Sequence, residues 1–200
     1  MFGNMIMIKV ITIISILIGF LMMFWRLYSE LNIYTPKYEI ISQNNYIEIR
    51  RYNKLNVIST TEHLPYKEAT HNGFRTLANY IFGKNIDNIK IPMTAPVITS
   101  FPNNENIDIA FIMNENYSID NLPKPITEKI TLQELELGKV AVIKFGLWAT
   151  PKRIQTKKTR LETYLNNNSI QHSAEFLVAQ YNSPWIMPPF RKNEILVSIN

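Results

Sequence analysis

The chain of 200 residues has no cysteine, six glycines and three histidines. Without cysteine it can form no disulfide, thiolate metal site or iron–sulfur cluster. The histidines, His63, His71 and His172, are not spaced like the ligands of a metal site. A glycine-rich phosphate loop and a nucleophile elbow are also missing. These absences predict a protein that is not an enzyme.

Charge is scarce, since 18% of the residues are charged and the net charge is +5. So mild and scattered an excess does not predict nucleic-acid binding. With 46% apolar residues, the chain can bury a core. The densest group of cations, within residues 152–160, is either a solvated helix face or a patch that faces anions such as lipid headgroups or ligand carboxylates. Its members are Lys152, Arg153, Lys157, Lys158 and Arg160.

The longest hydrophobic run lies at the N-terminus. Residues 10–25 carry no charge, and from Met5 onwards the run is interrupted only by Lys9. A helix over residues 5–25 would be about 31 Å long, close to the thickness of a hydrocarbon core. An aromatic belt of Phe24, Trp25 and Tyr28 and the cation Arg26 would follow it. This pattern predicts an uncleaved single-pass membrane anchor.

Two alternatives to the anchor stay open, a cleaved secretory signal and a buried helix. The charges that flank the run do not decide on which side of a membrane the rest of the chain would lie. We therefore predict an anchor and linker over residues 1–35, a membrane localisation, and a ligand-binding domain over residues 36–200.

Residues 90–98 form an apolar segment that is typical of a strand but contains Pro92 and Pro96. Both prolines would remove N–H donors from the same edge of such a strand, because alternate residues address the same edge. The segment therefore predicts a strand with one incomplete ladder, placed at an open seam of a sheet or at a ligand.

Five segments, in order, resemble the SOUL haem-binding family. They are Tyr38-Glu-Ile with Ile47-Glu-Ile-Arg-Arg-Tyr, Gly73 to Asn85, Ile91-Pro-Met-Thr-Ala-Pro-Val, Val140 to Ala149 with its Phe-Gly step, and Tyr181 to Ile195 with Pro-Pro-Phe-Arg-Lys-Asn-Glu. The resemblance covers about residues 38–199. It implies an antiparallel sheet with flanking helices, an architecture that this family shares with bacterial effector-binding domains.

The order of elements recurs with an offset of 84 residues, at which Thr76–Ile81 falls on Arg160–Leu165. Helices are predicted from about Tyr66 to Phe82 and, capped by Thr150, from Pro151 to about Leu165. The predicted strands span residues 46–51, 55–61, 107–113, 130–137 and 140–145. The predicted fold class is α+β, with duplicated β-α-β-β halves that form a curved antiparallel sheet or distorted β-barrel, two flanking helices and an N-terminal transmembrane helix.

The resemblance implies non-covalent binding of haem or a related tetrapyrrole. Such a ligand requires apolar and aromatic side chains together with cations for its propionates. Some family members have a histidine, proposed to bind iron, between the arginine and tyrosine of the opening strand, but here that residue is Arg51. The identity of a metal ligand is therefore unknown, and His63 and His71 are each either a substitute ligand or a lone surface histidine. The predicted contacts are Arg50, Arg51, Met93, Trp148, Trp185, Met187, Phe190, Arg191, His63 and His71.

Two other functions remain open at this point. One is an effector-binding module for a different apolar or cationic small molecule, and the other is an interaction protein whose cleft is filled by its own side chains. Arg191 and Glu194 are predicted to pair and to fix the last turn before the final strand. The sequence does not decide the oligomeric state.

Overall fold

The computed structural model describes the chain over residues 2–31, 33–102 and 105–200. It separates into two compact units, Met1–Ile33 and Tyr34–Asn200, and each is described by itself. The functional division into residues 1–35 and 36–200 stays a prediction.

The first unit is a helix, α1 (Phe2–Leu31). Its described side chains are those of Met7, residues 9–22, Trp25 and Tyr28, so that the predicted roles of Phe24 and Arg26 lie outside them. Across the described residues, no helix combines the length and the apolar content that are needed to cross a membrane. The predicted transmembrane helix and single-pass membrane localisation are therefore wrong.

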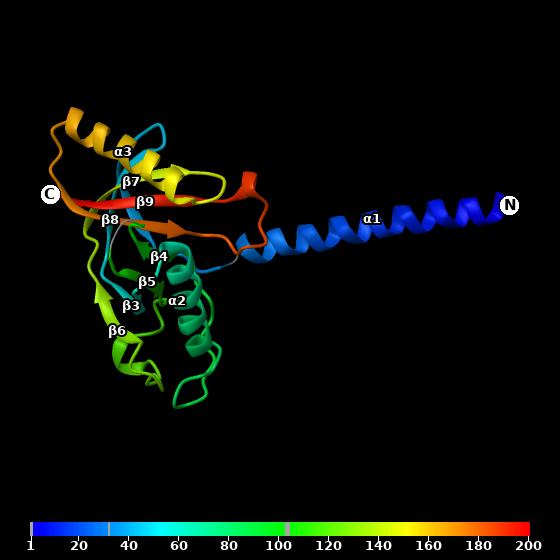
Figure 1. Ribbon diagram of the computed structural model, residues 1–200, viewed down its shortest axis with the longest axis horizontal. Helices are drawn as coiled ribbons and strands as arrows, with labels where there is room; N and C mark the ends of the chain where they lie inside the picture. Colours follow the sequence, from blue (N-terminus) through cyan, green and yellow to red (C-terminus); the bar gives the residue numbers. More distant parts are fainter. Residues whose placement is uncertain (1, 32, 103–104) are drawn as a thin grey trace. The chain divides into compact units, whose positions relative to one another are not determined.

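The second unit contains nine strands and two α-helices among its described residues (Figure 1). The strands are β1 (Tyr38–Asn44), β2 (Ile47–Tyr52), β3 (Leu55–Glu62), β4 (Val97–Ser100), β5 (Ile107–Ile112), β6 (Thr131–Leu135), β7 (Lys139–Phe145), β8 (His172–Gln180) and β9 (Asn193–Ile199). The helices are α2 (Tyr66–Ile81) and α3 (Pro151–Asn167), with short 3₁₀ turns at Ile119–Asn121 and Pro188–Phe190.

The strands form one antiparallel sheet in the order β1-β2-β7-β9-β8-β4-β5-β3-β6. Helix α3 packs on β2, β7, β8 and β9, and α2 packs on β3 and β5, both on the same face. On the other face one hydrophobic cluster contains both Tyr52 of β2 and Val57 of β3. These strands are six places apart in the order, about 29 Å in a flat sheet. The sheet therefore curls around this inner cluster, with β1 and β6 as its two edges, so that of the two predicted forms it is the curved, open sheet.

The sheet is built from two copies of one unit, which exchange their first strands. The first copy is β2-β3-α2-β4-β5 and the second is β6-β7-α3-β8-β9. Strand β2 pairs with β7 of the second copy, and β6 pairs with β3 of the first. The ladder positions agree, since Arg50 opposite Val140 corresponds to Leu135 opposite Leu55, 85 residues away in each strand. The repeated unit has one strand more than predicted, because this strand makes its pairs outside its own half.

Local sequence explains where the helices begin and end. The Thr150 hydroxyl accepts a hydrogen bond from the Arg153 N–H at the start of α3, and Pro151 stands at the first helical position. After α2 the chain turns at Gly83, whose φ of +105° suits glycine. Helix α2 approaches β5 at Gly73, where a Cβ atom would lie 2.5 Å from Cδ1 of Ile109.

The predicted strand at residues 90–98 is largely wrong. Strand β4 begins only at Val97, and it is paired on both sides, with β5 and with β8. Before it, the chain bonds elsewhere, since the Ala95 N–H donates to the Tyr34 carbonyl at 2.9 Å and the Ile91 N–H to the Ile81 carbonyl at 2.8 Å. The β4–β8 ladder joins the two halves, so that no open seam separates them there.

Candidate functional site

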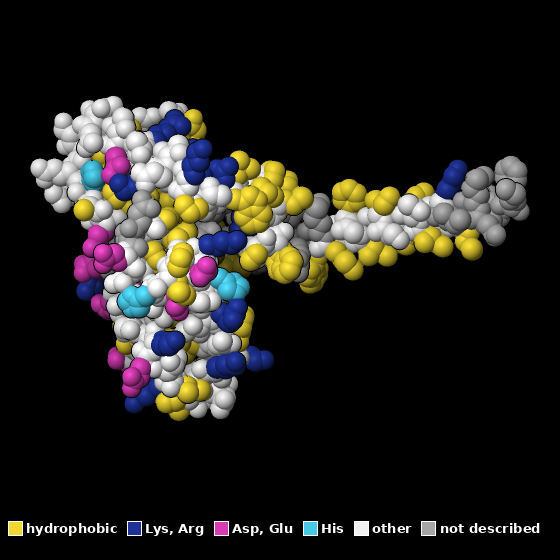
Figure 2. All heavy atoms as spheres, viewed as in Figure 1, with side chains coloured by type: hydrophobic (Ala, Val, Ile, Leu, Met, Phe, Trp, Pro, Cys, Tyr) yellow, Lys and Arg dark blue, Asp and Glu magenta, His cyan; other side chains and the backbone are white. Residues whose placement is uncertain are grey.

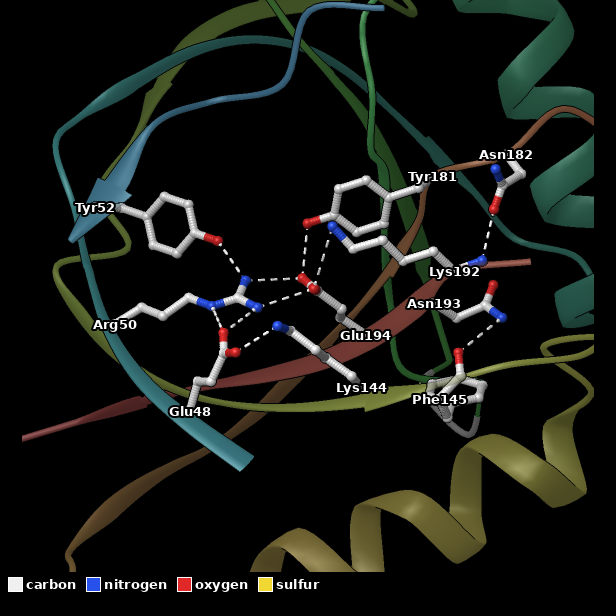
Figure 3. A network of polar contacts seen from close by, with 10 residues as sticks. All are labelled: Glu48, Arg50, Tyr52, Lys144, Phe145, Tyr181, Asn182, Lys192, Asn193 and Glu194. Carbon is white, nitrogen blue, oxygen red and sulfur yellow. Dashed lines mark hydrogen bonds and ion pairs between the residues drawn. The ribbon is translucent and has the colours of Figure 1, made fainter. Parts of the chain in front are cut away.

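A buried polar network lies on the inner face of the sheet, at β2 and β9 (Figure 3). Strand alternation places Glu48, Arg50 and Tyr52 on this face. The Arg50 guanidinium donates to both oxygens of Glu194 at 2.9 Å, to Glu48 at 2.8 Å and to the Tyr52 hydroxyl at 2.9 Å. The Tyr38 ring covers it, 4.1 Å from ring centroid to guanidinium carbon. Arg50 and Glu194 are 0% exposed.

Two lysines and a tyrosine extend this network towards the surface. Lys144 forms an ion pair with Glu48, and the Lys192 ammonium lies 3.6 Å from a Glu194 oxygen. The Tyr181 hydroxyl donates to Glu194 at 2.7 Å, and Lys192 lies 3.8 Å from the centroid of the Tyr181 ring. Every buried charge in the network thus has a hydrogen-bonded partner of opposite charge.

The environment shifts the pKa values of the network in directions that keep its charges. Burial would raise the pKa of Glu48 and of Glu194, but the bonds from Lys144 and Arg50 to Glu48, and from Arg50 to Glu194, leave both pKa values below the ordinary one. Burial raises the pKa of the Tyr52 hydroxyl to about 12, and burial also raises the pKa of the Tyr181 hydroxyl. The carboxylates are therefore ionised, and the phenols neutral, near neutral pH.

The network joins β2 to β9 and leaves little capacity for a ligand. Where β6 pairs with β3 and β3 with β5, the ladder positions that correspond to Glu48, Arg50 and Glu194 are held by Gln133, Leu135 and Ala110. The fold thus accepts neutral residues at equivalent places. We interpret the network as a clamp between strands.

A second cluster of interest, which we call the aromatic loop surface, is exposed and apolar. It consists of Leu147, Trp148, Trp185, Met187 and Phe190, on the loops that follow β7 and β8. The loops are held side by side, because the Leu147 N–H donates to the Pro188 carbonyl at 3.1 Å and the Asn193 side-chain amide donates to the Leu147 carbonyl at 2.8 Å.

Arg191 is buried against these loops and holds their backbone by hydrogen bonds. Its Nη1 donates to the carbonyls of Ser183 and Ile186 at 3.2 Å each, and its guanidinium carbon lies 4.2 Å from the centroid of the Trp148 ring. The surface nevertheless stays open to solvent, since 73% of Trp185 is exposed.

Cations stand at the border of the aromatic loop surface, on the first turn of α3. Lys152 is exposed, and Arg153 is half-buried with its guanidinium on the Trp148 carbonyl. Two basic residues in a first helical turn oppose the helix dipole, and this turn contains no acid to offset them. The arrangement offers a flat apolar area beside positive charge.

The family model described as "SOUL heme-binding protein" matches residues 33–198 of this chain. The chain belongs to the SOUL heme-binding protein family. Similar curated proteins include heme-binding protein 2 of Homo sapiens, 29% identical over 68% of this chain and 70% of that protein. Heme-binding protein 1 of Xenopus laevis is 27% identical over 74% of this chain and 80% of that protein.

Among solved structures, the SOUL domain resembles the EcmrR C-terminal domain, with a TM-score of 0.61, 10% identity, and coverage of 82% of this chain and 98% of that one. It also resembles a hydrolase encoded by lin2189 from Listeria innocua, with a TM-score of 0.57, 8% identity, and coverage of 84% and 94%. At such identities the likeness shows a shared fold alone.

The structure brings half of the predicted contacts of the SOUL domain together. Trp148, Trp185, Met187, Phe190 and Arg191 all belong to the two linked loops. Four of them present apolar side chains to solvent, whereas Arg191 lies beneath and acts on the loop backbone.

The other predicted contacts lie elsewhere. Arg50 is enclosed in the polar network, and Arg51, one residue further along the strand, is exposed and forms an ion pair with Glu39 at 3.2 Å. Met93 is half-buried and packs on the hydrophobic cluster beneath α2.

Both substitute histidines are exposed and hydrogen-bonded to neighbours. His63 bonds to the Asn106 side chain at 2.7 Å, and His71 bonds to Arg75 one turn along α2. Over the described residues, no three His, Asp or Glu side chains gather in a way that could hold a metal ion.

Sequence reasoning missed the polar network, in which Glu194 pairs with Arg50. A signal was available, because Glu48 and Arg50 alternate with Ile47 and Ile49 in a strand that is buried on both faces.

Part of the predicted cation group on α3 contacts other side chains of the domain. Lys158 pairs with Glu162 and lies 4.4 Å from the Phe176 ring centroid, and Arg160 lies 4.6 Å from that of Tyr46.

Proposed function

We propose that the SOUL domain binds haem, or a related tetrapyrrole, non-covalently on the aromatic loop surface. Family membership supports the ligand class, since the family and its curated relatives are described as heme-binding. The absence of cysteine leaves no residue for thioether attachment. Binding rather than catalysis is the proposed role.

The residues at this surface fit such a ligand. Haem supplies a planar apolar macrocycle with iron at its centre and two propionates at one edge. Trp148, Trp185 and Phe190 offer exposed rings for the macrocycle, and Met187 offers a flexible thioether side chain. Lys152 stands at the border, where it would attract the propionates.

The observation that carries the proposal is that these large side chains are exposed on ordered loops. Arg191 and Asn193 hold the loop backbones by hydrogen bonds to carbonyl groups, while Trp185 and Phe190 remain in water. Large apolar patches on a soluble surface mark binding sites. The open shape favours a reversible complex, consistent with buffering, transport or sensing of the ligand.

A hemin titration of the full chain, followed by the Soret band, tests the proposal. We expect saturation at a defined stoichiometry. Phe190→Ala and Trp185→Ala each remove a ring that contacts the macrocycle, so that we expect each to weaken the apparent affinity about tenfold.

Phe82→Ala is the matched control, because Phe82 is 58% exposed and Phe190 is 59% exposed. It removes an equally accessible ring outside the aromatic loop surface, and the affinity for hemin should not change. Hemin binding without a defined stoichiometry would refute specific binding at this surface. An affinity for hemin that falls equally in Phe190→Ala and in the control Phe82→Ala would refute it as well.

A further inference from the structure

The first half of the SOUL domain carries a second exposed apolar surface, on the loops that follow α2 and the 3₁₀ turn. We call it the isoleucine knob. It consists of Phe82, Ile86, Ile89 and Ile126, of which Ile126 is 68% exposed. The two loops are adjacent, because the Ile86 N–H donates to the Lys124 carbonyl at 3.0 Å and Asn85 forms a β-bridge with Pro125.

The loop backbone beneath the knob is held by a buried side chain. Asn85 is 0% exposed, and its amide nitrogen donates to the Tyr80 carbonyl at 3.0 Å and to the Ile89 carbonyl at 2.7 Å. Its amide oxygen accepts the Ile89 N–H at 3.0 Å. The Tyr80 hydroxyl in turn donates to the Pro123 carbonyl of the second loop at 2.6 Å. The isoleucines are therefore presented to solvent by an ordered scaffold.

Positive charge surrounds the knob. The segments 82–90 and 123–129 carry four lysines and two acids, all exposed. They are Lys84, Lys90, Lys124 and Lys129, against Asp87 and Glu128. Figure 2 shows hydrophobic side chains at this end of the domain with Lys or Arg side chains on both sides.

We propose that the isoleucine knob docks on an anionic lipid surface. Side chains that protrude from loop tips enter the headgroup layer of a fluid bilayer without a shaped cavity, and lysines above it attract anionic headgroups. A second copy of the chain would bring lysines against lysines, which disfavours self-association through this surface. The contact is peripheral and uses no membrane-spanning segment.

A reporter placed in the knob tests this proposal on the full chain. Because the chain has no cysteine, Ile126→Cys gives a single site for the environment-sensitive dye NBD. We expect its emission to rise and shift to the blue with vesicles of three parts phosphatidylcholine to one part phosphatidylserine, and to change little with phosphatidylcholine alone.

The matched label is Lys67→Cys, at the opposite end of the 16-residue helix α2, about 20 Å away along its axis. Its emission should stay constant. A response at both sites would mean that another part of the chain brings the protein to the vesicle, and this would overturn the proposal. So would the absence of a response at residue 126.

A charge variant tests the role of the lysines. In the chain labelled at residue 126, Lys124→Glu should raise the concentration of anionic lipid needed for half-maximal response about tenfold, whereas Lys67→Glu should not change it. Equal effects of the two variants would overturn the proposal. Without vesicles, an emission change that depends on protein concentration would show that a second copy of the chain covers the isoleucine knob. That result would also overturn the proposal.

Discussion

Arg50 is the central residue of the buried polar network that joins β2 to β9. It is fully buried, with two carboxylates and a tyrosine hydroxyl as partners. Its counterpart in the repeat, Leu135 of β6, packs against the inner hydrophobic cluster. Equivalent positions on the inner face of the sheet are therefore filled by an ion-pair network at Arg50 and by apolar packing at Leu135.

This comparison predicts a compensation between substitutions. Arg50→Leu alone strands Glu48 and Glu194 as buried acids without the guanidinium, and it should lower the free energy of unfolding by about 3–5 kcal/mol. The triple variant Glu48→Gln, Arg50→Leu, Glu194→Ala installs the residues found at the equivalent ladder positions, Gln133, Leu135 and Ala110, and should recover most of that loss. Urea unfolding of the full chain measures both values. A triple variant no more stable than Arg50→Leu would contradict the compensation.

At the scale of single residues, sequence reasoning selected side chains of the aromatic loop surface but missed the charged network. Aromatic residues among prolines, as at Trp185 and Phe190, can be recognised from the local sequence. The partners of Arg50 do not, because Glu194 is 144 residues away and becomes a neighbour only through the β2–β7–β9 ladders.

Helix α2 shows how packing overrides propensity at the scale of an element. Glycine inside a helix normally costs about 1 kcal/mol relative to alanine. At Gly73, however, the helix touches Ile109 of β5, so that the missing Cβ allows the close approach.

Gly73→Ala should therefore destabilise the domain, by about 1–3 kcal/mol, despite the better helix propensity of alanine. Gly73→Ala combined with Ile109→Val, which removes the Cδ1 atom in conflict, should recover part of this loss. Thermal unfolding of the full chain measures both. A stabilising effect of Gly73→Ala alone would show that β5 can move away from α2 without a loss of free energy.

Helices and most strands were predictable because their signals are local. Thr150 and Pro151 mark the start of α3, and Gly83 follows the end of α2. The segment before β4 was not, because the bonds of Ile91 and Ala95 go to α2 and to Tyr34 rather than to a neighbouring strand. The apolar pattern of α1 likewise predicted a span that the described residues do not support.

At the scale of the whole molecule, the ionised and neutral groups of the network define a pH window of stability. Glu48 and Glu194 have pKa values below the ordinary one, so that their contribution is complete above about pH 5 and is lost as the pH falls through their folded-state pKa values. Tyr52 and Tyr181 have raised pKa values, so that theirs is complete below about pH 10 and is lost as the pH rises further.

The unfolding midpoint of the full chain should accordingly stay nearly level between about pH 5 and pH 10 and fall at both ends. In the triple variant of Glu48, Arg50 and Glu194, the acid side of this profile should be shallower, since the two carboxylates are gone. Midpoints from thermal unfolding across the pH range measure the effect. An unchanged acid side in the variant would assign acid unfolding to other carboxylates.

Because β2 and β6 are exchanged between the halves, one copy of the motif cannot complete its own strand pairing. Each half donates its opening strand to the other, as β2 joins β7 and β6 joins β3. A polypeptide with a single copy of the motif would leave one strand with nowhere to pair and one ladder unfilled. A symmetric dimer with swapped arms would fill both, whereas the two-copy chain fills both within one polypeptide.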